Sequence, residues 1–270
     1  MNSEPTPRVV SLRYTLQSRD EVSYVNPQPV EFETDEAHFR MAEGKLTCVM
    51  KAHFPTVQAA RSVVEPILRA WEVTADLRRT RGELRFAFDG ADFVDRSPGT
   101  PRVLRAHAGG YAVVGGTLSF HITRRQYPDP PLAFRLNPDA ESMWLRYQGY
   151  LDGREPLQGM AYFCLTVLEA TTGGRKHAAE RYRIDLQVLN KIGKLTSEHG
   201  DPMSRRKATA LRPLTGSERE WLEAAVKMMI WQLGDTRDAS ALPVLKMSDL
   251  PRLCMRTGRY DGTRRDHYKR

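Results

Sequence analysis

Two clusters of basic residues are the parts of this sequence best suited to binding chemistry. The first is Ser204-Arg-Arg-Lys207, which precedes the last predicted helix. The second is the segment after Pro251, in which arginines are interspersed with Tyr260 and Tyr268. Basic side chains contact phosphate oxygens, and aromatic rings stack on bases. The candidate nucleic-acid-binding residues are therefore Arg205, Arg206, Lys207, Arg256, Arg259, Arg264, Arg265 and Lys269.

The net charge favours the same interpretation. The 270 residues include 41 Lys and Arg and 33 Asp and Glu, which gives a formal net charge of +8. Residues 255–270 contain six basic and two acidic side chains, so this tail supplies half of the excess. A basic surplus favours an anionic partner, either nucleic acid or an acidic protein. A solvated loop and a disordered basic end are the alternative interpretations of the two clusters.

The sequence contains no complete catalytic or metal-binding motif. Its seven histidines lack HxxxH and HExxH spacing, and its three cysteines include no CxxC pair. GxxxxGK[ST], GxGxxG and GxSxG sequences are also missing. We therefore expect no cofactor and no metal ion, and we favour a binding function over catalysis. The odd cysteine count is not a disulfide framework and fits a reducing cytoplasm.

One short pattern could serve a metal-dependent nuclease. Glu43-Gly-Lys45 has the E-x-K form, and Asp35 lies eight residues before the glutamate. The carboxylates would hold a metal ion, and the lysine would orient the attacking water. The same residues fit a solvated hairpin edge, which is the interpretation we adopt. Cys164 lies on the most apolar predicted helix, where a thiol stays protonated, and is expected to belong to the core.

The first half of the chain is predicted to be β-rich. Apolar residues alternate with polar ones over 10–16, 46–54, 84–88 and 118–122, which is the period of half-buried strands. One helix is predicted between Pro55 and Arg78, because apolar residues recur there every three or four positions. Pro66 lies inside that pattern and is expected either to kink the helix or to mark a late start. This helix should cover one face of an antiparallel sheet.

The second half changes to helical periodicity after a proline-rich segment. Helices are predicted to begin at Pro138 and Pro156, and the second of these is apolar nearly all round. A third apolar stripe runs from Ile184 to Leu195, and Thr215-Gly-Ser-Glu218 is a capping box that opens the last helix. The predicted fold class is α+β. Its parts are a β-rich domain at 1–125, a linker at 126–136, a helical bundle at 137–235 and a basic tail at 236–270.

The sequence around the central helix of the second half resembles known groups of proteins. Residues 147–169 resemble uncharacterised bacterial proteins. Their sequence is Tyr147-Gln-Gly-Tyr-Leu-Asp-Gly-Arg-Glu155-Pro-Leu-Gln-Gly-Met-Ala-Tyr-Phe-Cys-Leu-Thr-Val-Leu-Glu169. In organisation, residues 140–235 are similar to methylamine-utilisation accessory proteins of the J type and to HEPN-like bundles. In those proteins a central apolar helix ends in Leu-Glu and later helices surround it.

The resemblance to HEPN-like bundles also allows a comparison with the catalytic arginine and histidine of active HEPN ribonucleases. Active HEPN ribonucleases carry an arginine, four to six residues and then a histidine on the last helix, where the histidine acts in proton transfer. In the helical half, His177 and His199 have no such arginine, and Arg259 is one residue too far from His267. Arg102 and His107 have the spacing, but they lie in the β-rich half. A HEPN-like bundle here would be a non-catalytic relative.

We therefore expect a non-catalytic binding or adaptor protein that contacts an anionic partner through the basic loop and tail. One alternative is metal-independent RNA cleavage involving His199 beside the Arg205 and Arg206 pair. Another is a structural protein that oligomerises through its helical half, with Trp144, Trp221 and Trp231 at the interface if they are exposed. No run reaches the ~18 apolar residues of a membrane span, so we expect no membrane partner.

Overall fold

The computed structural model describes residues 8–18, 22–79, 81–94, 103–107, 122–197, 213–238 and 241–253. It confirms the mixed content, with strands in the first half of the chain and helices through the second. The chain forms two compact units, Met1–Leu145 with Met229–Leu242, and Arg146–Met228 with Pro243–Arg270. These boundaries fall inside two helices and so differ from the predicted divisions at 126–136 and 235.

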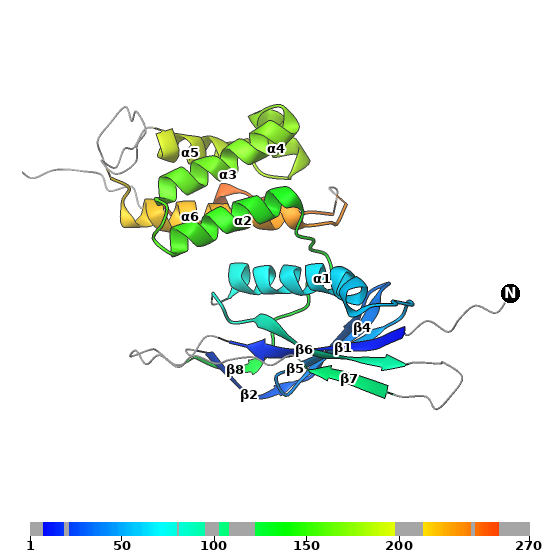
Figure 1. Ribbon diagram of the computed structural model, residues 1–270. Coiled ribbons are helices and arrows are strands. Elements are labelled where there is room, and N and C mark those ends of the chain that lie inside the picture. The colour runs from blue at the N-terminus through cyan, green and yellow to red at the C-terminus, as the bar shows by residue number, and fades with distance from the viewer. Residues whose placement is uncertain are drawn as a thin grey trace, which may run out of the picture. The chain divides into compact units, whose positions relative to one another are not determined.

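Six strands of the first unit form an antiparallel sheet in the order β3-β4-β5-β1-β6-β7 (Figure 1). Their bounds are β1 (Arg8–Gln17), β3 (Val30–Glu33), β4 (Ala37–Ala42), β5 (Lys45–Met50), β6 (Arg85–Val94) and β7 (Val103–His107). A separate pair of parallel strands consists of β2 (Val22–Gln28) and β8 (Ile122–Gln126). Of the four predicted strands, the one at 118–122 lies outside the described residues except for Ile122.

A register shift in β1 corrects one detail of the strand prediction. The pairing of β1 with β6 shifts between Val9 and Ser11, and again between Arg13 and Tyr14. Such irregularities change which residues face the core. As a result Val9 is fully buried, whereas Val10 is only partly buried although the alternation placed it in the core. The strand predicted at 46–54 is also shorter, because β5 ends at Met50.

The helix α1 (Val57–Arg78) confirms the helix predicted for residues 55–78 and lies over one face of the six-stranded sheet (Figure 1). It begins after Thr56, whose hydroxyl oxygen accepts a hydrogen bond from the Ala59 backbone N–H at 3.1 Å. This cap satisfies one of the free amides at the helix start. Trp71 anchors the helix in the core, where its buried indole N–H donates to the Pro128 carbonyl at 3.1 Å.

The second half of the described chain is helical. Its helices are α2 (Pro138–Leu151), α3 (Leu157–Thr172), α4 (Arg175–Arg181), α5 (Leu186–Ser197) and α6 (Gly216–Gly234), and a short 3-10 turn follows at Met247–Asp249. Within the second unit, α3 packs against α4 and α5, as its apolar composition predicts. Pro156 occupies the N-cap of α3 rather than its first helical position, and Gly173 ends the helix in a left-handed conformation. The sequence analysis did not predict α4.

The capping box of α6 forms as predicted. The Glu218 backbone N–H donates to the Thr215 hydroxyl at 3.3 Å, and the Thr215 backbone N–H donates to the Glu218 carboxylate at 2.9 Å. The C-terminal end of α6 belongs to the first unit. There Trp231 stacks on Phe134, which follows the proline-rich segment. Gly234 is required there, because a Cβ atom would lie 2.2 Å from the Phe134 ring.

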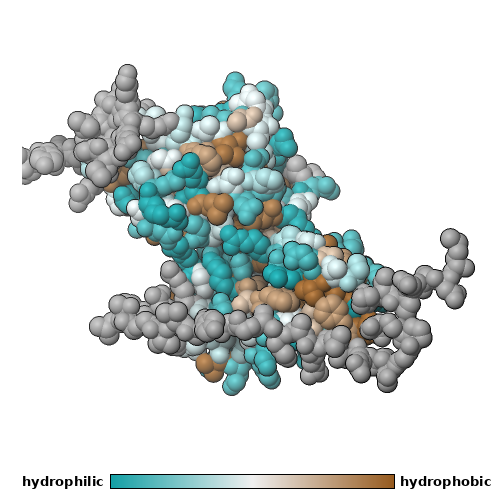
Figure 2. All heavy atoms as spheres, in the orientation of Figure 1, coloured by the Kyte–Doolittle hydropathy of each residue, from teal (hydrophilic) through white to brown (hydrophobic). Residues whose placement is uncertain are grey.

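The tryptophans proposed for an interface lie mainly in the core. Trp144 and Trp221 are fully buried, and Trp231 is partly buried between Phe134 and the guanidinium of Arg78. On the face shown in Figure 2, hydrophobic residues of the described chain form small groups between hydrophilic ones. The oligomerisation alternative therefore draws no support from these side chains.

Candidate functional site

A polar pocket of about 560 Å³ lies in the first unit, beside the β2–β8 pair and the end of α1. Its lining residues are all polar or charged, and three of them are arginines. They are Asn26, Gln28, Arg79, Thr123, Arg124, Arg125 and Gln126. The set includes no carboxylate, histidine or cysteine. A pocket of this composition is suited to binding an anion rather than to acid–base catalysis.

The parallel pairing of β2 with β8 brings the two sides of the pocket together. Ser23 pairs with Thr123 and Tyr24 with Arg124, and after a register shift Gln28 pairs with Gln126. The additional residues of β2 are accommodated at the shift, where Asn26 has a φ of +46°. Asparagine tolerates this left-handed conformation better than most residues. The irregularity therefore places amide side chains beside the arginines of β8.

A buried carboxylate organises two of the three arginines. The Glu83 side chain is fully buried, and its oxygens lie 3.4 Å from Arg79 Nη1 and 3.3 Å from Arg124 Nε. The Tyr24 hydroxyl lies 3.3 Å from Glu83 Oε1. Burial, and then the nearby Glu83 charge, raise the pKa of Tyr24 above its ordinary value. Tyr24 consequently stays neutral, and Glu83 is the negative charge that the two guanidinium groups share.

The three arginines differ in how many of their guanidinium N–H groups already donate hydrogen bonds within the protein. Arg79 also donates to the carbonyl oxygens of Gln126 at 3.2 Å and Tyr127 at 3.5 Å, so it fastens the end of α1 to β8. Arg125 is exposed and forms no ion pair within the described residues. The pocket thus keeps two net positive charges after Glu83 is counted. Arginine donors match the oxygens of phosphate groups, which they can contact in pairs.

The predicted binding residues lie outside the described residues. This applies to the loop Arg205–Lys207 and to the tail residues Arg256, Arg259, Arg264, Arg265 and Lys269. His199, assigned to the ribonuclease alternative, lies outside them as well. The assignments remain predictions. Sequence analysis missed Arg79, Arg124 and Arg125, although the adjacent pair Arg124-Arg125 at the end of a strand was a visible signal.

The E-x-K pattern forms a hairpin turn. Glu43 and Gly44 have φ values of +50° and +73° and connect β4 to β5, which pair as far as Ala42 and Lys45. Positive φ at both central residues is the conformation of a two-residue hairpin. Asp35 is exposed at the preceding turn. Within the described residues, no group of three or more His, Cys, Asp or Glu side chains could hold a metal ion.

Two cysteines belong to the core, as expected for Cys164. Cys48 and Cys164 are both fully buried and free. Burial raises the pKa of both thiols, which keeps them protonated and poorly nucleophilic at neutral pH. Cys254 lies outside the described residues. The described cysteines therefore offer no nucleophile.

Comparison with protein-family models, curated proteins and solved structures finds no match for the chain. The resemblance of residues 140–235 to HEPN-like bundles therefore stays a prediction. Among the described helices, none combines the length and apolar composition needed to cross a membrane.

Proposed function

We propose that this chain is a non-catalytic binding protein that contacts the phosphate groups of nucleic acid. The observation that carries the proposal is the polar pocket in which Arg79, Arg124 and Arg125 converge. The net charge of +8 and the predicted basic loop and tail support it. The pocket would provide an ordered contact with the backbone, and the loop and tail would add further contacts.

The nucleic acid is favoured over an acidic protein because of the groups that accompany the arginines. Asn26, Gln28 and Gln126 add amide donors and acceptors, and the lining contains no apolar side chain. Protein interfaces usually have an apolar centre, whereas contacts with phosphate and sugar oxygens are made by arginine, threonine and amide side chains. The composition of the pocket therefore fits a sugar–phosphate backbone.

The test is binding of fluorescently labelled single-stranded RNA and DNA, measured across a salt titration. Oligonucleotides of about 20 nucleotides exceed the ~4–16 nucleotides that one single-strand-binding fold typically covers. Each phosphate contact contributes about −0.7 to the slope of log K against log salt for single strands. We expect the Arg125→Gln variant to lower the affinity at low salt and to reduce the slope by about 0.7.

Arg40→Gln is the matched control, because Arg40 is also an exposed arginine on a strand but lies on β4, away from the pocket. A variant with Arg205, Arg206 and Lys207 changed to glutamine, and a chain ending at Pro251, separate the loop and tail from the pocket. No binding of either nucleic acid at low salt would overturn the proposal. Equal affinities of the Arg125→Gln and Arg40→Gln variants would remove the pocket from it. Competition by polyglutamate as effective as by RNA would instead indicate an acidic protein partner.

A further inference from the structure

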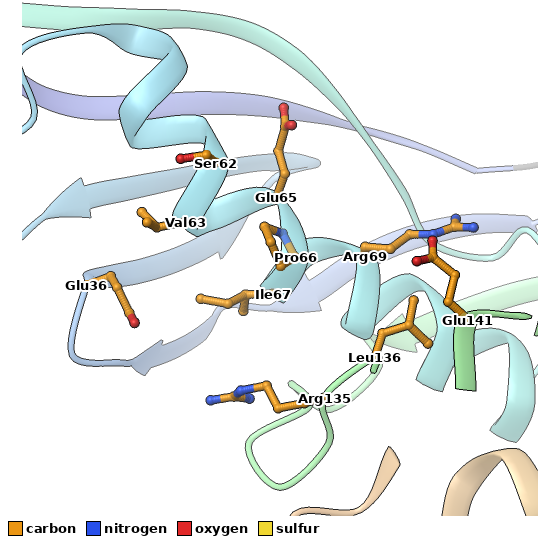
Figure 3. Close-up of a pocket in the computed structure, with 10 residues that line it drawn as sticks. All are labelled: Glu36, Ser62, Val63, Glu65, Pro66, Ile67, Arg69, Arg135, Leu136 and Glu141. Atoms are coloured by element: carbon orange, nitrogen blue, oxygen red, sulfur yellow. The ribbon is translucent and has the colours of Figure 1, made fainter. Parts of the chain in front are cut away.

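A second pocket, of about 620 Å³, lies within the first unit beside the middle of α1 (Figure 3). Side chains from α1, from the turn before β4, from the segment leading into α2 and from α2 itself line it. Its volume falls in the ~300–1,000 Å³ range of ligand pockets. In contrast to the arginine-rich pocket, it combines apolar side chains with charges of both signs.

Pro66 interrupts the hydrogen bonding of α1 where this helix lines the pocket. Proline has no backbone N–H, so residue 66 cannot donate the helical hydrogen bond to the carbonyl of Ser62. Both residues line the pocket. The Ser62 carbonyl therefore lacks its usual helical donor, at a place where α1 lines the pocket. The pyrrolidine ring of Pro66 and the side chains of Ile67 and Leu136 add apolar surface beside it.

Two carboxylates stand at opposite sides of the pocket, as Figure 3 shows for Glu36 and Glu141. Neither forms an ion pair with another described residue, whereas Glu65 and Arg69, which also line the pocket, are paired with Arg61 and Glu72. A hydrogen bond from the Thr34 hydroxyl, the local backbone N–H and the charge of Arg135 lower the pKa of Glu36. Glu36 is thus ionised at neutral pH and available to a cation.

Arg135 completes the polar lining. Its Nη1 donates to the backbone carbonyls of Phe134 at 3.1 Å and Pro131 at 3.4 Å, which holds the guanidinium beside the pocket without a carboxylate partner. The remaining donors of this group can bind an oxygen acceptor. The pocket therefore offers two anionic sites, one backbone acceptor, one cationic donor group and an apolar floor.

We propose that this pocket binds a short segment of a partner protein in which an apolar residue stands between two basic ones. The basic side chains would contact Glu36 and Glu141, and the apolar side chain would lie on Ile67 and Leu136. A peptide N–H would donate to the Ser62 carbonyl, and a peptide carbonyl would accept from Arg135. The two free carboxylates outnumber the one unpaired guanidinium, which selects for a positively charged segment. This inference does not depend on binding of nucleic acid.

The test uses the full chain and a fluorescein-labelled, C-terminally amidated peptide, Gly-Lys-Leu-Lys-Gly, with Gly-Glu-Leu-Glu-Gly as the reversed-charge probe. Fluorescence anisotropy at about 0.15 M salt keeps screening near its physiological strength. We expect saturable binding of the lysine peptide and binding of the glutamate peptide at least tenfold weaker. Replacing the central leucine by serine should also weaken binding, because it removes the contact with the apolar floor.

Variants of the pocket assign the contacts. Glu36→Gln and Glu141→Gln should each weaken binding about threefold to tenfold, since each removes one charge-assisted hydrogen bond. Pro66→Ala restores the N–H that occupies the Ser62 carbonyl, so it should weaken peptide binding while leaving the melting temperature unchanged or higher. Glu31→Gln is the control, because Glu31 is an exposed carboxylate on β3 that pairs with Arg40 outside the pocket.

Three results would overturn the inference. The first is no saturable binding of the lysine peptide by the wild-type chain. The second is equal affinity for the two peptides. The third is a Glu36→Gln, Glu141→Gln double variant that binds the lysine peptide as tightly as the Glu31→Gln control. Melting temperatures measured on the same samples show that each variant is folded.

Discussion

Replacing Glu83 by glutamine should destabilise the first unit more than the same change at a carboxylate whose ion pair is exposed to solvent. Glu83 is fully buried, and it is the shared partner of Arg79 and Arg124, which retain 27% and 33% of their side-chain exposure. Glutamine keeps the size of the side chain and one acceptor oxygen. It removes the negative charge and places an NH₂ group where one carboxylate oxygen faced a guanidinium.

The expected cost follows from the burial of the pair. Removing one partner of a buried ion pair costs about 3–5 kcal/mol, because the other charge remains uncompensated. Here water still reaches part of both guanidinium groups, and the glutamine oxygen replaces one acceptor, so we expect about 2–3 kcal/mol. The Glu31–Arg40 pair provides the matched comparison. Its N–O distance is also 3.3 Å, but its side chains are 51% and 60% exposed, and exposed pairs contribute about 0–1 kcal/mol.

The measurement is equilibrium urea unfolding of the wild-type chain and of the Glu83→Gln and Glu31→Gln variants, with the free energy of unfolding obtained by linear extrapolation. We expect Glu31→Gln to stay within about 0.5 kcal/mol of the wild type. A Glu83→Gln variant as stable as Glu31→Gln would refute the reasoning. It would mean that Arg79 and Arg124 are held by backbone carbonyls and solvent, and that the shared carboxylate is dispensable.

Two further substitutions probe other parts of the first unit. Gly234→Ala should lower the free energy of unfolding by about 3 kcal/mol, because the new Cβ would lie 2.2 Å from the buried Phe134 ring. Gly216→Ala, at the other end of α6, should leave the free energy of unfolding unchanged, because nothing lies within 4 Å of its new Cβ. Equal urea midpoints for the two variants would contradict the argument. Burial alone would raise the pKa of Asp235, but hydrogen bonds from the Arg237 guanidinium and backbone N–H, at 2.5–3.1 Å, lower it below the ordinary value. The stabilisation is therefore complete above about pH 4, the ordinary aspartate pKa, and is lost as the pH falls through the lowered pKa. In thermal unfolding between pH 6 and pH 2.5, Asp235→Asn should remove about 0.5–1 kcal/mol of this pH dependence, and an Asp235→Asn variant with the pH dependence of the wild type would contradict the argument.

Local periodicity predicted the helices well because the necessary information lies within each segment. The apolar spacing between Ala60 and Ala75 corresponds to the buried face of α1. The Thr215 capping box forms because its two hydrogen bonds join residues three apart. The strand β4 was also visible in principle, since Ala37, Phe39 and Met41 alternate with polar residues and are fully buried. The sequence analysis overlooked that alternation.

The pairing that creates the arginine pocket could not be predicted in this way. Tyr24 and Arg124 are a hundred positions apart, and their strands lie side by side in parallel. No local pattern specifies a partner at that separation, and the register shift at Asn26 adds a second irregularity. Arg79 reaches the same place only because α1 ends there. The residues could be identified as basic, but their convergence is a property of the fold.

The arginines of the pocket divide into two roles, and this division limits what the pocket can do alone. Arg79 and Arg124 neutralise Glu83 and join α1 to β8, so part of their hydrogen-bonding capacity is used within the protein. Arg125 has no such commitment among the described residues. A pocket with two net positive charges can neutralise about two phosphates, which gives a salt slope near −1.4 for single strands. A steeper slope requires contacts from elsewhere on the chain. The loop at 205–207 and the tail after Pro251 hold the basic residues that could supply them, so the slope that remains after both are removed measures the contribution of the pocket itself.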